Sequence, residues 1–368
     1  MTMKSFLVVF RVDASVEIGT GHVMRCLTLA EELRRQGHDC RFICRDHRGH
    51  LGELIAGKGF PVNLLLTTVE DSLDYSRGYG TAHSEWLGVP WQLDAAQTLS
   101  LLESLPVDWL VVDHYALDAH WERQVCTVVG RIIAIDDLAD REHHVDLLLD
   151  QNLGRSANDY NELVPDHCIR LIGPGYALLR PEFSEFRERS LRRRGETKLS
   201  RILVSMGGMD TPNATTAVLK ALEASDLPST LDFDVVMGST APWLDEVRHL
   251  SERSRFGIRV STNVQNMAER MCLADLSIGA AGSTSWERCV LGLASIAVSQ
   301  AHNQSAILKA LAVAGAAERL SFPFEDLELS GIVNSFLQDP EKLSTMAANA
   351  SRVCDGMGTA RVVGWLNG

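Results

Sequence analysis

The stretch IGTGHVMRC, residues 18–26, decides the fold of the first half of the chain. An apolar run at residues 6–12 precedes it and predicts a β-strand, and the residues after it have the composition of a helix. Glycine adopts positive φ at little cost, so Gly19 and Gly21 permit a tight turn between the two elements. This order of elements is typical of a parallel α/β domain, and it places His22 beyond the C-terminal end of the first strand.

The same turn carries groups suited to binding an anion and moving a proton. The amides and the dipole at the start of the helix favour an anion. A neutral imidazole accepts a proton from water, which makes His22 a candidate general base. We expect Asp13 to orient this ring or to raise its basicity, with Arg25 nearby. The alternative is that His22 only caps the helix or packs against it.

The size and charge of the chain limit its class. It has 368 residues, which predicts two domains of about 150–200 residues each. Hydrophobic residues make up 45% and charged residues 23%, as in ordinary globular proteins. The formal net charge of -13 argues against non-specific binding to nucleic acid or to an acidic membrane surface. It leaves open a local positive site for a phosphate-bearing small molecule.

The cysteines and the apolar runs indicate a cytoplasmic protein. The closest pair of cysteines, Cys40 and Cys44, has no matching second pair, so we expect reduced thiols and no metal site. Arg11 and Asp13 interrupt the N-terminal apolar run, which is then too short for a signal sequence. No apolar run reaches the ~18 residues of a membrane-spanning helix.

Strand-like and helix-like segments alternate in both halves of the chain and predict two parallel sheets covered by helices. We place the first domain at residues 1–180, a charged linker at 181–198 and the second domain at 199–368, with its last helix free to pack back on the first domain. The charge run is also consistent with a basic phosphate-binding patch or a solvated helix. Two such domains are expected to hold a substrate between them.

Polar residues follow several predicted strands of the first domain. They occur at residues 113–115, 136–137 and 150–152, and Tyr115 is among them. Each of these groups alone is explained by a turn or a helix N-cap. Together they predict a polar rim at the edge of the sheet where parallel α/β folds bind their ligands.

A second glycine-rich turn, GAAGSTSWE at residues 279–287, lies between a predicted strand and a helix. Backbone amides near Gly282 are suited to hold a diphosphate, and Ser283 and Thr284 add hydroxyl donors. Glu287 is placed to accept hydrogen bonds from the two hydroxyls of a ribose, although an acid there also suits the helix dipole alone. The pattern matches neither a Walker loop nor the dinucleotide fingerprint.

Two further segments of the second domain are candidates for ligand binding. Gly207 and Gly208 form a glycine turn after a predicted strand, either near the same phosphates or as a simple βα loop. Asn303 and Gln304 open a later helix, where they are either ligand contacts or a cap and a surface amide.

Ordered pieces of the chain resemble the PseG family, the UDP-2,4-diacetamido-2,4,6-trideoxy-β-L-altropyranose hydrolases of pseudaminic acid biosynthesis. The matching pieces are residues 11–15, 18–27, 112–115, 135–141, 149–152, 175–183, 205–208 and 281–287. They run nearly from end to end, which makes the resemblance more specific than any single glycine turn.

The resemblance implies a fold similar to the GT-B glycosyltransferases, including the MurG type. In that fold, two Rossmann-like βα domains face each other across a cleft. It also implies that His22 activates a water molecule, which attacks the anomeric carbon so that the C–O bond breaks with inversion and UDP leaves. The family is understood to need no metal, and we expect no cofactor. The expected place of the protein is then the cytoplasm, in a pathway of flagellin glycosylation.

The resemblance also implies which residues bind the substrate. The second domain holds UDP, with the backbone near Val264 at the uracil and Glu287 at the ribose. The expected sugar contacts are Asp13, Gly19, Gly21, Arg25, Tyr115 and Asn303. The expected UDP contacts are Gly207, Gly208, Val264, Gly282, Ser283, Thr284 and Glu287. The partners are a UDP-sugar substrate and UDP product, with no nucleic acid and no membrane, and we expect a monomer.

Two features lie outside this resemblance. The proline that the family usually has near residues 292–294 is missing, and residues 67–98 match nothing that we can place and are a candidate for a sugar contact. Two other functions stay open: a GT-B UDP-sugar glycosyltransferase of the MurG type, and a non-catalytic nucleotide-sugar binding protein. The sequence leaves the exact sugar and the oligomeric state open.

Overall fold

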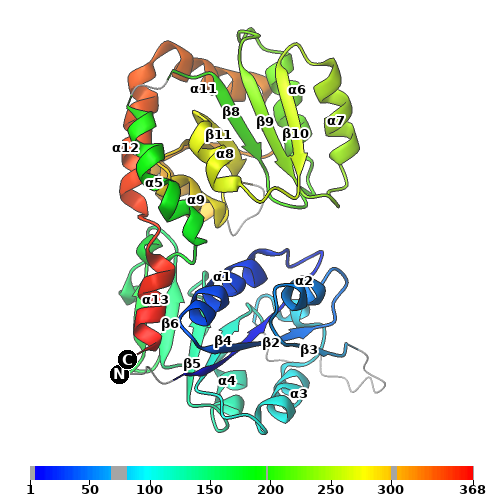
Figure 1. Ribbon diagram of the computed structural model, residues 1–368, viewed down its shortest axis with the longest axis vertical. Coiled ribbons are helices and arrows are strands. Elements are labelled where there is room, and N and C mark those ends of the chain that lie inside the picture. The colour runs from blue at the N-terminus through cyan, green and yellow to red at the C-terminus, as the bar shows by residue number, and fades with distance from the viewer. Residues whose placement is uncertain (1–4, 68–80, 196–197, 300–304, 368) are drawn as a thin grey trace. The chain divides into compact units, whose positions relative to one another are not determined.

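The computed structural model describes residues 5–67, 81–195, 198–299 and 305–367. The chain forms two compact units. Unit 1 comprises Met1–Leu178 and Thr359–Gly368, and unit 2 comprises Leu179–Gly358. Each unit is an α/β structure with helices packed on a parallel sheet (Figure 1), which is the predicted class.

Unit 1 is built on a seven-stranded parallel sheet in the order β3-β2-β1-β4-β5-β6-β7. Its strands are β1 (Leu7–Val12), β2 (Asp39–Arg45), β3 (Val62–Leu65), β4 (Trp109–Asp113), β5 (Arg131–Ile135), β6 (Leu147–Asp150) and β7 (Ile169–Ile172). Its helices are α1 (Gly21–Arg35), α2 (Gly52–Gly57), α3 (Trp91–Leu102), α4 (Ala119–Val125) and α13 (Gly358–Leu366), with short 3-10 turns η1 (Ser84–Leu87), η2 (Ala157–Tyr160) and η3 (Pro174–Tyr176).

Side chains of the central strand β1 alternate between two core layers. Val8, Phe10 and Val12 pack in the layer that includes α1 and α13. Val9 packs in the other layer, with residues of α3 and α4. Successive side chains of a strand point to opposite faces, and both faces of this sheet are covered. The strands therefore read as unbroken apolar runs in the sequence.

Unit 2 repeats the plan with a six-stranded parallel sheet in the order β10-β9-β8-β11-β12-β13. Its strands are β8 (Arg201–Ser205), β9 (Asp232–Met237), β10 (Gly257–Thr262), β11 (Leu276–Ala280), β12 (Ala294–Ser299) and β13 (Glu318–Ser321). Its helices are α5 (Pro181–Arg194), α6 (Ala214–Glu223), α7 (Leu244–Arg253), α8 (Met267–Leu273), α9 (Thr284–Val290), α10 (Ser305–Val313), α11 (Asp326–Gln338) and α12 (Pro340–Val353).

The order of strands reverses once in each sheet. In unit 1 the chain builds outward from β1 through β2 and β3, then returns to add β4 on the other side of β1. In unit 2 the same reversal occurs between β8 and β11. Open parallel sheets bind ligands beyond the C-terminal ends of the strands at such a reversal. The topology therefore predicts ligand sites beyond the C-terminal ends of β1 and β4 in unit 1 and of β8 and β11 in unit 2.

The charged run that we predicted as a linker forms the helix α5 within unit 2. Arg187 donates a hydrogen bond to the carbonyl of Val290 at the end of α9, and Arg194 donates to that of Met271 near the end of α8. The last carbonyls of a helix have no partner within it and accept such bonds favourably. Part of the high charge of residues 181–194 therefore comes from arginines that cap neighbouring helices.

The C-terminal helix α13 completes the core of unit 1 and not that of unit 2. Val362, Val363 and Leu366 are buried in the same layer as Phe10 of β1. Unit 1 is consequently made of two segments that are distant in sequence, with its first segment ending at Leu178.

The helices and the metal-binding side chains can be described for residues 5–67, 81–195, 198–299 and 305–367. None of the helices there is long and apolar enough to cross a bilayer. Within the same ranges, no group of three or more His, Cys, Asp or Glu side chains has an arrangement that could hold a metal ion.

Candidate active site

His22 and Asp113 meet where β1 and β4 end. Helix α1 begins directly after a turn in which Gly19 has a φ of +79°. Residues that carry a side chain rarely adopt this backbone conformation. His22 is the second residue of α1, and Asp113 is the last residue of β4. Nδ1 of His22 lies 2.6 Å from Oδ1 of Asp113. The glycine turn and the reversal of strand order together bring these two side chains into contact.

The Asp113 carboxylate determines which nitrogen of His22 carries the hydrogen. A carboxylate only accepts hydrogen bonds, so Nδ1 of His22 donates to Asp113. In the neutral ring, Nε2 is then the unprotonated nitrogen. Among the described residues, nothing hydrogen-bonds to Nε2, and the His22 side chain is 11% exposed. This arrangement leaves Nε2 as the proton acceptor of the ring.

Arg25 also holds Asp113. Its Nε and Nη2 atoms donate to the two oxygens of the Asp113 carboxylate at 2.6 and 2.7 Å, a paired geometry that fixes the carboxylate plane. Burial alone would raise the pKa of Asp113, but the positive charge of Arg25 and the contact with His22 outweigh it and hold the pKa well below its usual range. Asp113 is therefore ionised throughout the neutral range.

Tyr115 and Asp137 extend this cluster. The third nitrogen of Arg25, Nη1, donates to Oδ2 of Asp137 at 2.6 Å, and the Tyr115 hydroxyl donates to the same oxygen at 2.7 Å. The Tyr115 ring meets the His22 ring edge-on, with 4.7 Å between the ring centres. Burial raises the pKa of Tyr115 well above its ordinary value, so the hydroxyl is neutral and acts as a donor.

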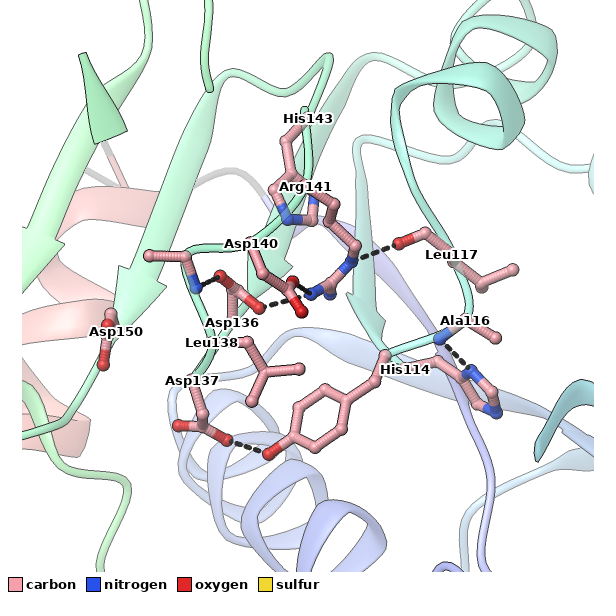
Figure 2. A network of polar contacts seen from close by, with 12 residues as sticks. His114, Ala116, Leu117, Asp136, Asp137, Leu138, Asp140, Arg141, His143 and Asp150 are labelled. Carbon is pink, nitrogen blue, oxygen red and sulfur yellow. Dashed lines mark hydrogen bonds and ion pairs between the residues drawn. The ribbon is translucent and has the colours of Figure 1, made fainter. Parts of the chain in front are cut away.

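A buried acidic network supports the loop that carries Asp137. Asp136 accepts hydrogen bonds from Arg141 at 2.7 Å and from the backbone of Ala139 at 2.8 Å (Figure 2). The Tyr160 hydroxyl lies 2.9 Å from Oδ2 of Asp136 and 2.9 Å from Oδ2 of Asp150. One hydroxyl has one hydrogen to donate, so one of these two contacts needs a proton on a carboxyl group.

The shifts in pKa identify Asp150 as the group that holds this proton. Burial and, to a lesser degree, the nearby charge of Asp137 raise the pKa of Asp150 to about 7. Burial also acts on Asp136, but the charge of Arg141 outweighs it and lowers that pKa to about 2. Asp136 is thus ionised at neutral pH, whereas Asp150 carries a proton below about pH 7.

Asp13 does not contact His22, contrary to our prediction that it orients the ring. It is fully buried, and its Oδ1 accepts hydrogen bonds from Arg11 and from the backbone of Arg45, both at 2.6 Å. The reason is the alternation of side chains along a strand. Asp13 follows Val9 and Arg11 on the face opposite α1, whereas Asp113 lies on the α1 face.

Residues 81–90 belong to the stretch 67–98 that matched nothing in the resemblance and that we named as a candidate for a sugar contact, and they lie beside the His22 cluster. The Trp86 ring stacks on Tyr115 with 5.7 Å between ring centres and an angle of 26°. His83 lies 5.4 Å from Tyr115 and 4.6 Å from Trp86, again between ring centres. The sequence offered one sign of this cluster, which is that His83 and Trp86 lie three residues apart at one short turn.

In unit 2, two glycine turns follow the adjacent strands β8 and β11. Gly207 has a φ of +89°, and a Cβ atom added at Gly207, Gly208 or Gly282 would meet no atom within 4 Å. The backbone of both turns therefore borders open space on the side where a side chain would stand. Ser283 and Thr284 lie at the start of α9, directly after Gly282.

A buried cation lies beneath these turns. The Arg288 guanidinium donates to the carbonyl of Ala280 at 2.8 Å and to the Ser285 hydroxyl at 2.9 Å. It packs so close to Gly279 that a Cβ there would lie 2.2 Å from its Nη1 atom. Within the described part of the chain, no carboxylate lies within ion-pair distance of it. Burial lowers the pKa of Arg288 to about 10, which leaves it charged at neutral pH.

Glu287 lies on the first turn of α9, with its side chain 15% exposed. Its nearest cation is Arg180, whose Nη2 atom is 3.8 Å from Oε1. Burial raises the pKa of Glu287 to about 7, because the charges of Arg180 and Arg288 only partly offset it. The carboxyl group is consequently poised between its two protonation states at neutral pH.

The remaining predicted contacts are Val264 and Asn303. Val264 follows the edge strand β10, outside the reversal point of the unit 2 sheet. Asn303 lies outside the described residues. Thus the structure brings His22, Arg25 and Tyr115 together in unit 1, and it adds Asp113 and Asp137, which we had placed only on a general polar rim.

Comparison with known proteins points the same way as the sequence motifs. The chain resembles the PseG hydrolases. The UDP-2,4-diacetamido-2,4,6-trideoxy-beta-L-altropyranose hydrolase of Campylobacter jejuni is 26% identical over 309 residues, which cover 84% of this chain and 97% of that protein. The spore coat polysaccharide biosynthesis protein SpsG of Bacillus subtilis is 32% identical over 203 residues, which cover 53% of this chain and 57% of that protein. No family model matches the chain.

Solved structures share the fold. The crystal structure of MurG from Acinetobacter baumannii covers 99% of both chains with a TM-score of 0.71 at 15% identity. The UDP-GlcNAc 2-epimerase of Neisseria meningitidis covers 99% of both chains with a TM-score of 0.58 at 12% identity. At these identities the likeness shows the fold alone. It confirms the predicted class, with two Rossmann-like domains as in the GT-B proteins.

Proposed function

We propose that the protein is a hydrolase that releases UDP from a UDP-linked diacetamido-trideoxy sugar, with His22 as the base that activates water. The observation that carries this proposal is the 2.6 Å contact between His22 Nδ1 and Asp113, which leaves Nε2 as the proton acceptor. The likeness to the Campylobacter jejuni hydrolase supports the substrate.

In this mechanism Nε2 of His22 takes a proton from a water molecule as its oxygen attacks the anomeric carbon. The ring becomes an imidazolium, which the Asp113 carboxylate stabilises through Nδ1. Arg25 keeps Asp113 ionised and in plane, so it is a positioning residue in this scheme. The bond between the anomeric carbon and the phosphate oxygen breaks, and UDP leaves with the electron pair.

We infer that unit 2 binds UDP. Support comes from the two glycine turns at its reversal point, whose backbone borders open space, and from the buried charge of Arg288 beneath them. UDP is already a good leaving group when such donors and charges stabilise its diphosphate. Glu287 is proposed to accept hydrogen bonds from the ribose hydroxyls.

The test is the release of UDP from the purified UDP-sugar in ¹⁸O-labelled water without any acceptor. Label in the free sugar identifies C–O cleavage, and the first anomer seen by NMR gives the stereochemistry. We expect His22→Ala to lose turnover by a factor of about 10² or more while UDP affinity is kept. Normal turnover in this variant would remove His22 from the mechanism.

A glycosyltransferase is the second candidate, favoured by the likeness of the fold to MurG. It would use the hydroxyl of an acceptor in place of water at the same base. Strict dependence of UDP release on an added acceptor would establish this alternative over hydrolysis. Binding of UDP-sugar with no turnover under either condition would indicate a non-catalytic binding protein.

A further inference from the structure

Three aromatic side chains form a wall next to the base. We call His83, Trp86 and Tyr115 the aromatic wall. Trp86 stacks on Tyr115, and His83 contacts both rings, with ring centres 4.6 to 5.7 Å apart. Tyr115 in turn contacts the His22 ring at 4.7 Å. The wall therefore begins at a ring that contacts the proposed base.

The fold fixes the position of Trp86. It belongs to the short turn η1, which is anchored in the core by Leu87 and Val89. Between them, Gly88 has a φ of +72°, and its backbone packs against the His47 ring so closely that a Cβ would lie 2.8 Å from it. Trp86 is partly exposed, and next to it Leu87 is buried whereas Glu85 is exposed. A large ring is thus held at the surface beside the site.

Trp86 supplies the apolar surface of the wall, because it is partly exposed whereas Tyr115 is only 6% exposed. The Tyr115 hydroxyl is bonded to Asp137, and the charges of Arg25 are directed at Asp113 and Asp137. Aromatic faces of this kind bury methyl and C–H groups favourably. Hydroxyl groups placed there would lose their hydrogen bonds to water without gaining new ones.

We propose that the aromatic wall is the subsite that binds the methyl-bearing face of the sugar and selects 6-deoxy, N-acetylated sugars over hydroxylated ones. This inference rests on the proposed function. A 2,4-diacetamido-2,4,6-trideoxy hexose has three methyl groups, at C6 and on both acetyl groups, whereas N-acetylglucosamine has one and carries hydroxyls at C4 and C6. The wall thus contacts the positions at which one sugar has methyl groups and the other has hydroxyl groups.

The test measures binding by calorimetry in the full chain carrying His22→Ala, which prevents turnover. The ligands are the UDP-diacetamido-trideoxy sugar, UDP-GlcNAc and UDP. We expect Trp86→Ala to weaken binding of the first ligand about 10-fold, to weaken UDP-GlcNAc by less than about 2-fold and to leave UDP unchanged. Trp86→Phe should restore much of the lost affinity, because it keeps an aromatic face.

The matched control is Trp91→Ala, which removes a tryptophan of the same unit whose ring contacts His120. It should leave the preference between the two sugars unchanged. Equal losses for all three ligands, or no loss for the diacetamido sugar, would overturn the proposal. This test measures binding, so it is independent of the test for hydrolysis. If the wild-type protein failed to hydrolyse the UDP-sugar but the preference between the two sugars still depended on Trp86, the proposed function would be rejected and the subsite would be retained.

Discussion

Asp113 sets the chemistry that His22 can perform. It holds the hydrogen on Nδ1, and it would stabilise the imidazolium formed when Nε2 takes a proton. We predict that Asp113→Asn lowers turnover by a factor of about 10² to 10⁴, because an amide can donate to Nδ1 and favour the wrong tautomer. Steady-state UDP release measures this effect.

UDP affinity is the internal control for that variant, because the proposed UDP site is in the other unit. Turnover close to that of the wild type would show that the tautomer of His22 does not matter to the reaction. A parallel loss of UDP affinity would indicate general misfolding, since Asp113 also pairs with the buried Arg25.

Glu287 should make UDP binding depend on pH. Its pKa is raised to about 7, and only the carboxylate form accepts hydrogen bonds from both ribose hydroxyls. UDP affinity should therefore increase as the pH rises from about 6 to about 8. The phosphate of the ligand also titrates, so the relevant quantity is the difference between the wild type and Glu287→Gln. The same pH dependence in both proteins would contradict the ribose role.

Among the single residues, the sequence singled out His22 but did not predict its contact with Asp113. His22 stands out because a glycine turn precedes it, which is a local pattern. Asp13 and Asp113 both follow apolar strands, and only the pairing of β1 with β4 and the side on which α1 packs distinguish them. The face of each strand residue follows from alternation, but the face that α1 covers is a tertiary property.

Among the elements, the loop between β5 and β6 is linked through the Tyr160 hydroxyl to the buried acid Asp150 at the end of β6. A buried acid whose pKa is raised to about 7 keeps its proton while the unfolded chain has released it above about pH 4. Stability contributed by this group is therefore lost as the pH rises from about 4 to about 7. The slope is about 1.4 kcal/mol per pH unit for one proton.

We predict that Asp150→Asn removes this part of the pH dependence. The free energy of unfolding of the variant, relative to that of the wild type, should therefore be more favourable at pH 8 than at pH 5. Chemical denaturation at several pH values measures it. Asp140→Asn, at a carboxylate of the same loop that is 41% exposed, is the matched control and should keep the wild-type slope. A wild-type slope in Asp150→Asn would show that another group holds the proton.

The predicted elements follow the observed ones where the signal is local. Apolar runs gave the central strands, and glycine turns gave the starts of α1 and α9. Helix α5 was interpreted as a linker because its charges suggested solvent, whereas its arginines bond to carbonyls of helices that are distant in sequence. The turn η1 had no sequence signal strong enough to place it against Tyr115.

For the molecule as a whole, the stability of unit 1 depends on the helix α13. Leu366 is 2% exposed in the layer that contains Phe10 of β1. We predict that Leu366→Ala destabilises unit 1 by about 2–5 kcal/mol, the usual cost of such a core truncation. Hydrogen exchange resolved by peptide should show faster exchange in β1 and unchanged exchange in β8.

Leu327→Ala is the control for that prediction, because Leu327 lies in unit 2 and is 86% exposed. It should change neither pattern of exchange. If Leu366→Ala accelerated exchange in β8 as much as in β1, the two units would unfold together. The prediction that α13 stabilises unit 1 alone would then be wrong.

The placement of α13 also matters while the chain is being made. A ribosome synthesises all of unit 2 before it reaches the helix that closes the core of unit 1. Unit 2 can therefore fold first, although most of unit 1 is translated earlier. A chain that ends prematurely, just before α13, would carry a complete unit 2 beside an unfinished His22 site. On the proposed function, such a product would capture the nucleotide sugar without turning it over.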